Sequence, residues 1–513
     1  MDDLVGLYSD LLTQIEEHAK RLLKPEFASL QELWQFELEL VKYQSKLQQA
    51  VAREKLVRQE LKTQSKLLVS TKAENWLEQV QQLEAKRKQV DHRIKIYRHA
   101  HQLSRQTGDA FAWVFLNEAI RPLTELPSNT RDGHHVADEH SLKGLLAIAE
   151  FLANSGAGFP ILHDVTNCLR VGDITFYSPE NEPATIEVKT HLIGNHEGIL
   201  SLEVEAHHID LKENKRWDAI MNNIPKHVSL SADSEDNKQT TPQFPTQLED
   251  RLQRQMERMK RAKLWQSMPD DRPFKLGDRE EGIKVFMHSE EELHHWDVIQ
   301  ELAIKAKKDG FAVRVVDDAF VYMVFYRDSS VAYPWIRGID QSFSEDLTAY
   351  NLPSYLVSSS LLYPEPEKNK LWVPVTKNVI PYVLPFYLYP LPTDFIMDIM
   401  WGRLVIGITV NLGKLVAALQ DSGLDARLPK DSDEFNRLFL PVSSKVSLPD
   451  NKQALVELRN LHFYGSKIAH EFLSLKGFVK LVSQMAQIGI KRAQDREAEK
   501  EHYAKINPTS TNA

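Results

Sequence analysis

Residues 172–190 read GDITFYSPENEPATIEVKT and have the most informative pattern in the chain. Asp173 opens a first strand-like run, and Glu187 and Lys189 lie in a second one. Residues 178–183 between the runs have the composition of a turn, so the pair predicts a β-hairpin. Because side chains alternate along a strand, Glu187 and Lys189 share one face. In the natural register Asp173 lies beside them, so two carboxylates and an amine converge at one point.

Such a group of residues is suited to hydrolysis of a phosphodiester bond. Two carboxylates supply the hard oxygen ligands that Mg²⁺ prefers, while the ion keeps part of its water shell. A bound Mg²⁺ polarises a phosphoryl group and lowers the pKa of a water molecule. A lysine beside it can stabilise the charge that develops on phosphate.

With Gly172 before the aspartate and apolar residues around Glu-Val-Lys, this segment resembles the PD-(D/E)XK nuclease superfamily. That superfamily includes restriction endonuclease-like, Mrr-like and resolvase-like enzymes. The resemblance covers roughly residues 139–265, about a quarter of the chain. It implies a helix followed by a mixed sheet, with the acids and the lysine on adjacent central strands.

The resemblance also implies roles for individual positions. The implied catalytic residues are Asp173, Glu187 and Lys189, and the implied metal ligands are Asp173, Glu187 and Val188. The implied cofactor is Mg²⁺, with Mn²⁺ as a substitute.

Related enzymes often add an acid from the preceding helix, and some add a glutamine or lysine from the following one. Glu150 and Glu139 are the candidate acids. Glu150 ranks first because it lies deeper in the amphipathic helix expected at 139–155, although an ordinary exposed glutamate is the alternative. Gln253 and Gln255 are the candidate glutamines.

Three arginines are candidate substrate ligands. Arg170 precedes Asp173 by three residues and is expected to hold a phosphate, or else to pair structurally with Asp164. Arg254 and Arg258 lie on one face of a helix expected at 247–264. They are expected to follow a phosphate backbone, unless they form a solvated face paired with nearby acids.

The first hundred residues predict a helical coiled-coil arm, assigned to 1–107. Apolar residues recur in alternating steps of three and four over 36–68 and again over 76–97. Thr71 and Glu74 have capping-box spacing at the break between the runs. We therefore expect an antiparallel helical hairpin, with one long interrupted helix as the alternative.

Charge is unevenly distributed along the chain. Residues 42–107 contain 15 Lys and Arg against 6 Asp and Glu, a net +9, whereas the whole chain carries −9. The remainder therefore carries −18. The basic arm is expected either to be a solvated face or to contact nucleic acid, and Arg87 occupies the one non-apolar seam position of the second run. Its seam is expected to support a homodimer or to bind a partner protein.

We expect an α+β multidomain protein: a helical coiled-coil arm, a restriction-endonuclease-like α/β core with a central mixed sheet, and a C-terminal α/β and helical region. The expected domains are the arm at 1–107, the nuclease-like domain at 108–265, a small α/β unit at 266–330, and a mixed strand and helix region at 331–513.

Several other classes of protein are disfavoured. The N-terminus lacks a basic segment before its apolar residues, and prolines interrupt the most apolar uncharged stretch, so neither a secretory signal nor a membrane span is expected. The single cysteine, Cys168, excludes an internal disulfide and fits a reducing cytoplasm. No Walker A motif or zinc-site spacing occurs.

The combined expectation is a cytoplasmic, Mg²⁺-dependent DNA endonuclease, with a role in restriction or defence against foreign DNA by family habit. Two alternatives remain open. One is a nuclease-like module that binds nucleic acid without cutting it, and the other is a coiled-coil scaffold protein.

Overall fold

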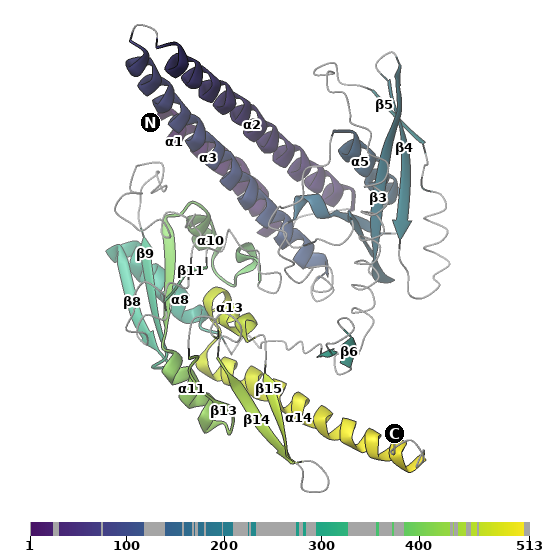
Figure 1. Cartoon of the computed structure of the whole chain (residues 1–513), viewed down its shortest axis with the longest axis vertical. Coiled ribbons are helices and arrows are strands. Elements are labelled where there is room, and N and C mark those ends of the chain that lie inside the picture. Colours follow the sequence, from purple (N-terminus) through teal and green to yellow (C-terminus); the bar gives the residue numbers. More distant parts are fainter. Residues whose placement is uncertain are drawn as a thin grey trace. The chain divides into compact units, whose positions relative to one another are not determined.

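The structure is a computed structural model of the whole chain (Figure 1). It describes residues 2–23, 30–72, 75–116, 139–155, 158–166, 169, 173–178, 181–196, 199–208, 224, 227–231, 273–275, 281–283, 294–326, 355–358, 372–373, 384–430, 434, 440–447, 453–458 and 461–506. These residues form two compact units. Unit 1 covers the described residues up to 268 together with Pro385–Leu388, and unit 2 covers the others.

Unit 1 begins with three helices, and the second and third form an antiparallel hairpin. The helices are α1 (Asp2–Leu23), α2 (Leu30–Thr71) and α3 (Trp76–Leu116). Three side-chain pairs connect the two helices: Arg58–Asp91 at 3.3 Å, Glu54–Arg93 at 2.7 Å and Gln48–His101 at 2.8 Å. Residues later in α3 pair with residues earlier in α2, so the two helices are antiparallel. The predicted hairpin is therefore confirmed over a single interrupted helix. Its seam residues Val90 and Ile94 are buried.

The predicted capping box at Thr71 is wrong. Thr71 is the last residue of α2, and its hydroxyl donates a hydrogen bond to the carbonyl of Leu67 at 3.0 Å. Lys72 and Asn75 have φ of 46° and 60°, so the backbone leaves the helical region before α3 begins. Thr71 therefore ends one helix and does not cap the next, and Glu74 lies outside the described residues.

Helix α3 continues without a break past residue 107, where the sequence places a domain boundary. Gly108, the first residue expected in the next domain, is buried inside α3. A Cβ atom at Gly108 would lie 2.0 Å from the carbonyl oxygen of Val165. The glycine is thus required for close approach of two backbones and does not mark a helix end.

Replacing Gly108 by alanine is expected to lower the free energy of unfolding by about 2–3 kcal/mol, because Val165 presents rigid backbone to the new methyl group. Gly6→Ala is the matched control, since Gly6 is also helical and a Cβ atom there would meet no other atom within 4 Å. The control should be about 0.5–1 kcal/mol more stable than wild type. Chemical denaturation measures both. Equal stability of the two variants would contradict the close packing at Gly108.

The other described residues of unit 1 include a five-stranded sheet and a helix that packs against it. Strand order is β1-β2-β3-β4-β5, and every pairing is antiparallel. The elements are α5 (Glu139–Asn154), β1 (Phe159–Leu162), β2 (Ile174–Ser178), β3 (Asn181–His196), β4 (Ile199–His208) and β5 (His227–Ser231). The helix and the β2–β3 hairpin lie close to their predicted positions.

The predicted mixed sheet is wrong for the described strands of unit 1. Two residues separate β2 from β3, and two separate β3 from β4. Such short connections can join only antiparallel neighbours, because a parallel neighbour needs a crossover of a dozen or more residues. The mixed helix-and-sheet character holds, but the arrangement is an antiparallel meander.

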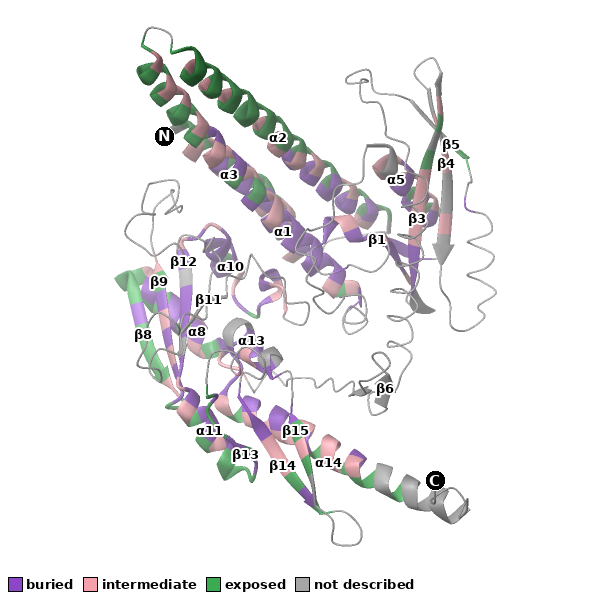
Figure 2. Ribbon diagram, in the orientation of Figure 1, coloured by how far each residue is buried: buried purple, intermediate pink, exposed green. Residues whose placement is uncertain are grey.

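The helical arm and the sheet share one hydrophobic core. Phe36 of α2, Phe111 of α3 and Phe159 of β1 are buried, and the ring of Phe111 lies 5.5 Å from that of Phe36 and 5.6 Å from that of Phe159. Figure 2 shows the buried part of the hairpin at its base and the exposed part toward the turn. The arm and the first part of the expected nuclease domain are therefore packed as one unit.

Unit 2 contains a second five-stranded sheet, of order β11-β10-β12-β9-β8, in which β10 and β12 are parallel. Asp317 and Asp318 have φ of 53° and 52°, which are the values that a tight turn between β8 and β9 requires. The elements of this part are α8 (Trp296–Asp309), β8 (Phe311–Val316), β9 (Phe320–Tyr326), β10 (Tyr355–Ser358), β11 (Trp372–Val373), α10 (Thr393–Met400) and β12 (Leu404–Val410).

The C-terminal part of unit 2 packs a small antiparallel sheet against helices. Its order is β13-β14-β15, and α14 and α11 contact each other beside it. The elements are α11 (Leu412–Asp421), β13 (Asp425–Ala426), β14 (Val442–Ser447), β15 (Gln453–Leu458), α13 (His462–Glu471) and α14 (Leu475–Ile506). A separate two-stranded ribbon pairs β6 (Pro273–Lys275) with β7 (Glu281–Ile283). In the described part of the chain no helix has the length and apolar character needed to cross a membrane.

Candidate active site

Asp173 directly precedes β2 and is hydrogen-bonded to the part of β3 that carries Glu187. Ile174 pairs with Ile186, and the backbone N–H of Asp173 donates to the Ile186 carbonyl at 2.9 Å. The paired register begins at Ile174, so hydrogen bonds, and not strand pairing, hold Asp173 beside β3. The Asp173 carboxylate accepts from the backbone N–H of Val188, so Asp173 is bonded to the residues on both sides of Glu187.

Asp173 is held by hydrogen bonds on both its backbone and its side chain. Its Oδ2 accepts from the backbone N–H of Val188 at 2.7 Å, and its carbonyl accepts from the backbone N–H of His163 at 2.9 Å. A carboxylate that accepts a backbone N–H is fixed in direction and stabilised in its charged form. Asp173 is thus tied to β3 beside Glu187 and to the loop after β1.

Glu187 and Lys189 lie on the face of β3 that is turned away from α5. The Thr190 side chain faces α5, because a Cβ at Gly144 of that helix would lie 2.1 Å from Thr190 Oγ1. Alternation then puts positions 187 and 189 on the other face. Both residues are half-buried, and Glu187 Oε2 is screened from solvent. A carboxylate oxygen out of water favours a cation or a hydrogen-bond donor nearby.

Buried polar residues lie beside the two acids. Thr175 pairs with Thr185, and His163 makes a 2.7 Å hydrogen bond from its ring Nε2 to Thr175 Oγ1. Two residues further along β2 than Thr175, the ring of Tyr177 lies 5.7 Å from that of Phe115 in α3. The base of the arm therefore reaches the strand that follows Asp173.

Three polar side chains from the arm fix the loop that supports Asp173. The Glu37 Oε1 accepts from the backbone N–H of Leu162 at 2.6 Å, Gln44 donates to the Val165 carbonyl at 3.1 Å, and Arg105 donates to the Thr166 carbonyl at 2.8 Å. Sequence reasoning missed all three. The only signal is their polar character at positions that belong to the buried side of amphipathic helices.

Burial changes the proton affinity of two acids near this loop. Glu37 is completely buried, which raises its pKa to about 8, and the hydrogen bond from Leu162 offsets part of this increase. Burial also raises the pKa of Asp164, and the positive charge of Arg105 acts in the opposite direction. Among the described residues, Arg105 therefore supplies the guanidinium near Asp164. The sequence suggested Arg170 for this position.

The structure does not bring Glu150 to the acid pair. Glu150 is exposed on α5, and α5 lies against the opposite face of β3 from Glu187. It has no ion pair or hydrogen bond with any other described residue. The geometry therefore gives Glu150 no place beside Asp173.

The structure does not describe the other side chains predicted to bind metal or substrate. The side chain of Glu139 and all of Arg170, Arg254, Arg258, Gln253 and Gln255 lie outside the described residues. By backbone register, β4 sets position 207 opposite Glu187 and position 205 opposite Lys189. These two β4 positions are the cross-strand neighbours of Glu187 and Lys189, and the sequence did not predict them.

The donor set of the site suits a hard divalent cation. In the described part of the chain, no group of three or more His, Cys, Asp and Glu side chains gathers where it could hold a metal ion. Two carboxylates are nevertheless a sufficient protein contribution for Mg²⁺, which is commonly bound by one or two carboxylates together with water and substrate phosphate. Asp173 and Glu187 fit that pattern, whereas they lack the nitrogen and sulfur donors typical of zinc.

Comparison with models of protein families, with curated proteins and with solved structures finds no match for this chain.

Proposed function

We propose that this protein is a metal-dependent nuclease that hydrolyses phosphodiester bonds at the site formed by Asp173, Glu187 and Lys189. The observation that carries the proposal is the hydrogen bonding of Asp173 to Ile186 and Val188, the residues on either side of Glu187, with Glu187 and Lys189 on one face of β3. The resemblance of residues 172–190 to PD-(D/E)XK nucleases supports the same function.

The three side chains have separate tasks in this proposal. Asp173 and Glu187 would hold Mg²⁺ through carboxylate oxygens, with the backbone at Val188 beside them. An ion held there would polarise the phosphoryl group as a Lewis acid and lower the pKa of a water molecule. Lys189 would stabilise negative charge on the phosphate oxygens as the bond to the attacking oxygen forms.

The contacts of the loop preceding Asp173 support the same function. A catalytic group must be held in position by its neighbours, because a small displacement greatly reduces the rate. Asp173 is bonded to Val188 and His163, and the loop containing His163 is bonded to Glu37 and Gln44 of α2. These contacts would hold the carboxylate in place before substrate arrives.

Purified protein incubated with supercoiled plasmid, linear DNA and RNA tests this function. We expect cleavage with Mg²⁺ or Mn²⁺ and none with EDTA. Closed circular DNA has no ends, so its nicking or linearisation would show endonuclease action on DNA. Asp173→Asn protein prepared in parallel should be inactive, which excludes a contaminating nuclease. Cleavage that persists in EDTA, or absence of cleavage of all three substrates by folded wild type, would contradict the proposal.

A further inference from the structure

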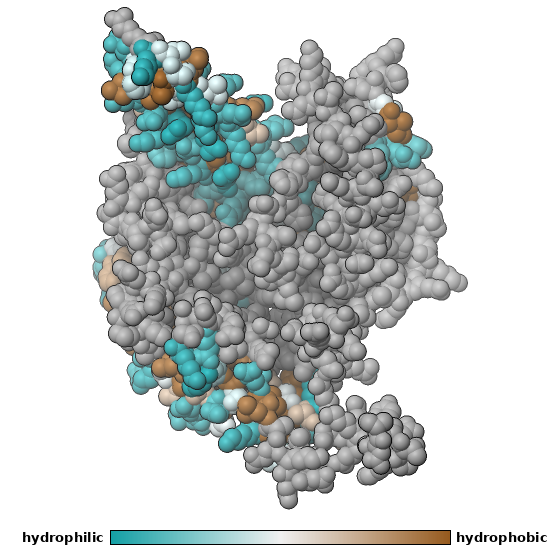
Figure 3. All heavy atoms as spheres, viewed as in Figure 1, coloured by the Kyte–Doolittle hydropathy of each residue, from teal (hydrophilic) through white to brown (hydrophobic). Residues whose placement is uncertain are grey.

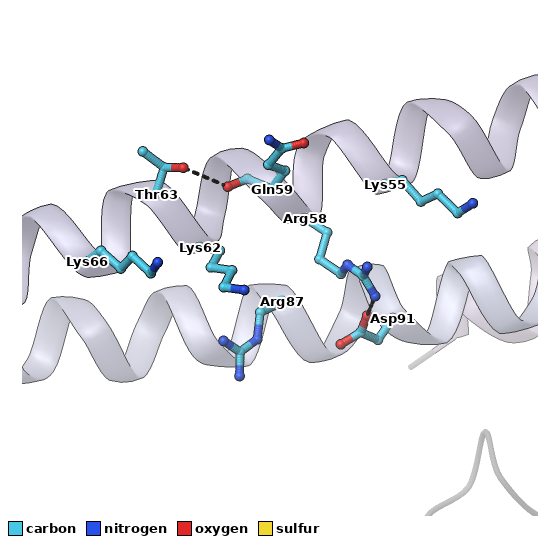
Figure 4. Close-up of a pocket in the computed structure, with 8 residues that line it drawn as sticks. All are labelled: Lys55, Arg58, Gln59, Lys62, Thr63, Lys66, Arg87 and Asp91. Atoms are coloured by element: carbon cyan, nitrogen blue, oxygen red, sulfur yellow. Dashed lines mark hydrogen bonds and ion pairs between the residues drawn. The ribbon is translucent and has the colours of Figure 1, made fainter.

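A basic pocket lies between α2 and α3 on the exposed part of the hairpin. It has a volume of about 860 Å³. Figure 4 shows Arg58 and Lys62 extending from α2 toward α3, where Asp91 and Arg87 lie. The lining residues are Lys55, Arg58, Gln59, Lys62, Thr63, Lys66, Arg87 and Asp91. We call these eight residues the basic pocket.

Positive charge dominates this pocket. Five of its lining residues are lysine or arginine and one is aspartate, which gives a net charge of +4. Arg58 pairs with Asp91 at 3.3 Å, but both side chains are largely exposed, so the pair is weak. Within the described part of the chain, Lys55, Lys62, Lys66 and Arg87 form no ion pair. Four cations are therefore available to an external anion.

The positive charges of the basic pocket are expected to destabilise the helical hairpin. Arg58, Lys62 and Lys66 follow one another at intervals of four residues, and like charges at this spacing weaken a helix. On α3, Arg87 occupies a seam position where the pattern of the coiled coil requires an apolar residue. Toward the hairpin turn, Leu61, Leu68 and the other seam residues are more exposed than at the base (Figure 2). Packing of the hairpin does not explain these cations.

We propose that the basic pocket binds the phosphodiester backbone of nucleic acid and holds the substrate before metal-dependent cleavage. This inference rests on the proposed nuclease function, because it assigns the substrate of that activity to a second surface. The chain carries a net charge of −9, and its site adds two carboxylates. These repel phosphate until a cation is bound, so initial binding requires a positive surface elsewhere.

The dimensions of the pocket suit a polyanion better than a single phosphate ion. The α2 residues from Lys55 to Lys66 extend over about 16 Å of helix, at 1.5 Å per residue. One strand of duplex DNA carries a phosphate for about every 3.4 Å of its axis, so this length faces about five phosphates. Hydrophilic side chains cover much of the hairpin surface visible in Figure 3. Such side chains can donate hydrogen bonds to the phosphates of nucleic acid.

A charge-reversal experiment in EDTA tests the pocket separately from cleavage. Lys62→Glu/Lys66→Glu reverses two exposed pocket lysines and keeps a like-charge pair at the same spacing. Lys86→Glu/Lys88→Glu is the matched control, since both lysines are exposed on α3, flank Arg87 and do not line the pocket. The two variants have the same net charge. Binding of labelled duplex DNA and of RNA is measured by fluorescence anisotropy over a range of salt concentrations, with thermal unfolding as the check on folding.

We expect the pocket variant to bind about tenfold more weakly at moderate salt, and the slope of log affinity against log salt to fall by about two, because two phosphate contacts are lost. The control should keep the wild-type slope and an affinity within about threefold of wild type. Three outcomes would overturn the inference: wild-type affinity in the pocket variant, equal losses in both variants, or tighter wild-type binding of polyglutamate than of either nucleic acid.

The same samples with Mg²⁺ separate this inference from the proposed function. An Asp173→Asn variant should bind nucleic acid in EDTA as wild type does, since it does not alter the pocket. Binding that depends on the pocket but is never followed by cleavage would reject the nuclease and keep the binding surface. Cleavage that is unaffected by the pocket variant at low substrate concentration would reject the binding surface and keep the nuclease.

Discussion

Replacing Glu187 by glutamine is expected to reduce the rate of metal-dependent cleavage by about a thousandfold, which corresponds to about 4 kcal/mol of transition-state stabilisation. The neutral amide has the size of the carboxylate but is a poorer ligand for a hard cation. Asp173→Asn and Lys189→Met are expected to have comparable effects. Single-turnover cleavage of plasmid DNA at saturating Mg²⁺ measures the rates.

Two further glutamates make this result specific. Glu84 is exposed on α3, and Glu84→Gln should keep the wild-type rate. Glu150→Gln distinguishes the sequence expectation from the structure, because α5 lies against the opposite face of β3 from Glu187. We expect Glu150→Gln to cleave at nearly the wild-type rate. If Glu150→Gln reduces the cleavage rate as much as Glu187→Gln does, Glu150 is a catalytic residue after all. A Glu187→Gln protein that is folded and fully active would remove Glu187 from the mechanism.

The second large effect concerns stability and comes from Glu37. Burial raises the pKa of Glu37 from 4.5 to about 8 in the folded protein. A folded-state pKa above the unfolded one means that folding is favoured while the group is protonated. This contribution is fully present below pH 4.5 and is lost as pH rises toward 8. The free energy of unfolding should therefore fall by an amount on the order of 4 kcal/mol across that window.

Glu37→Gln isolates this contribution. Glutamine keeps an acceptor oxygen for the Leu162 N–H but cannot ionise. We expect the variant to be more stable than wild type above pH 8 and to lack the decline between pH 5 and pH 8. Loss of contact with water lowers the pKa values of buried His99 and half-buried His101 to about 3, and both histidines titrate alike in the two proteins and cancel in the difference. Parallel denaturation curves at every pH would show that Glu37 is ionised in the folded state.

Local pattern was sufficient to predict the elements around the site. The turn composition of residues 178–183 and the alternation in Ile186, Glu187 and Val188 depend on neighbours a few residues apart, so they were enough to predict the hairpin. The helical hairpin was predictable for the same reason. The prediction for its turn was wrong because Thr71 can bond either forward into a new helix or back into its own.

The parts that could not be predicted depend on contacts between distant segments. Glu37 and Leu162 are 125 residues apart, and nothing local shows that an α2 glutamate accepts a hydrogen bond from the last residue of β1. Gly108 looked like a domain boundary because its need for close approach to Val165 is visible only in the fold. The mixed sheet came from the family resemblance, whereas the short connections around β3 require antiparallel strands. The heptad pattern shows that Arg87 stands where an apolar residue is expected, but its place beside Arg58 and Lys62 is visible only in the fold.

Binding of Mn²⁺ to the folded protein without nucleic acid tests the central claim most directly. Calorimetric titration compares wild type with Asp173→Asn and Glu187→Gln, and circular dichroism confirms that all three are folded. If these two carboxylates hold the ion, each variant should bind Mn²⁺ at least about tenfold more weakly than wild type. Indistinguishable Mn²⁺ binding by the three proteins would contradict a metal site at Asp173 and Glu187.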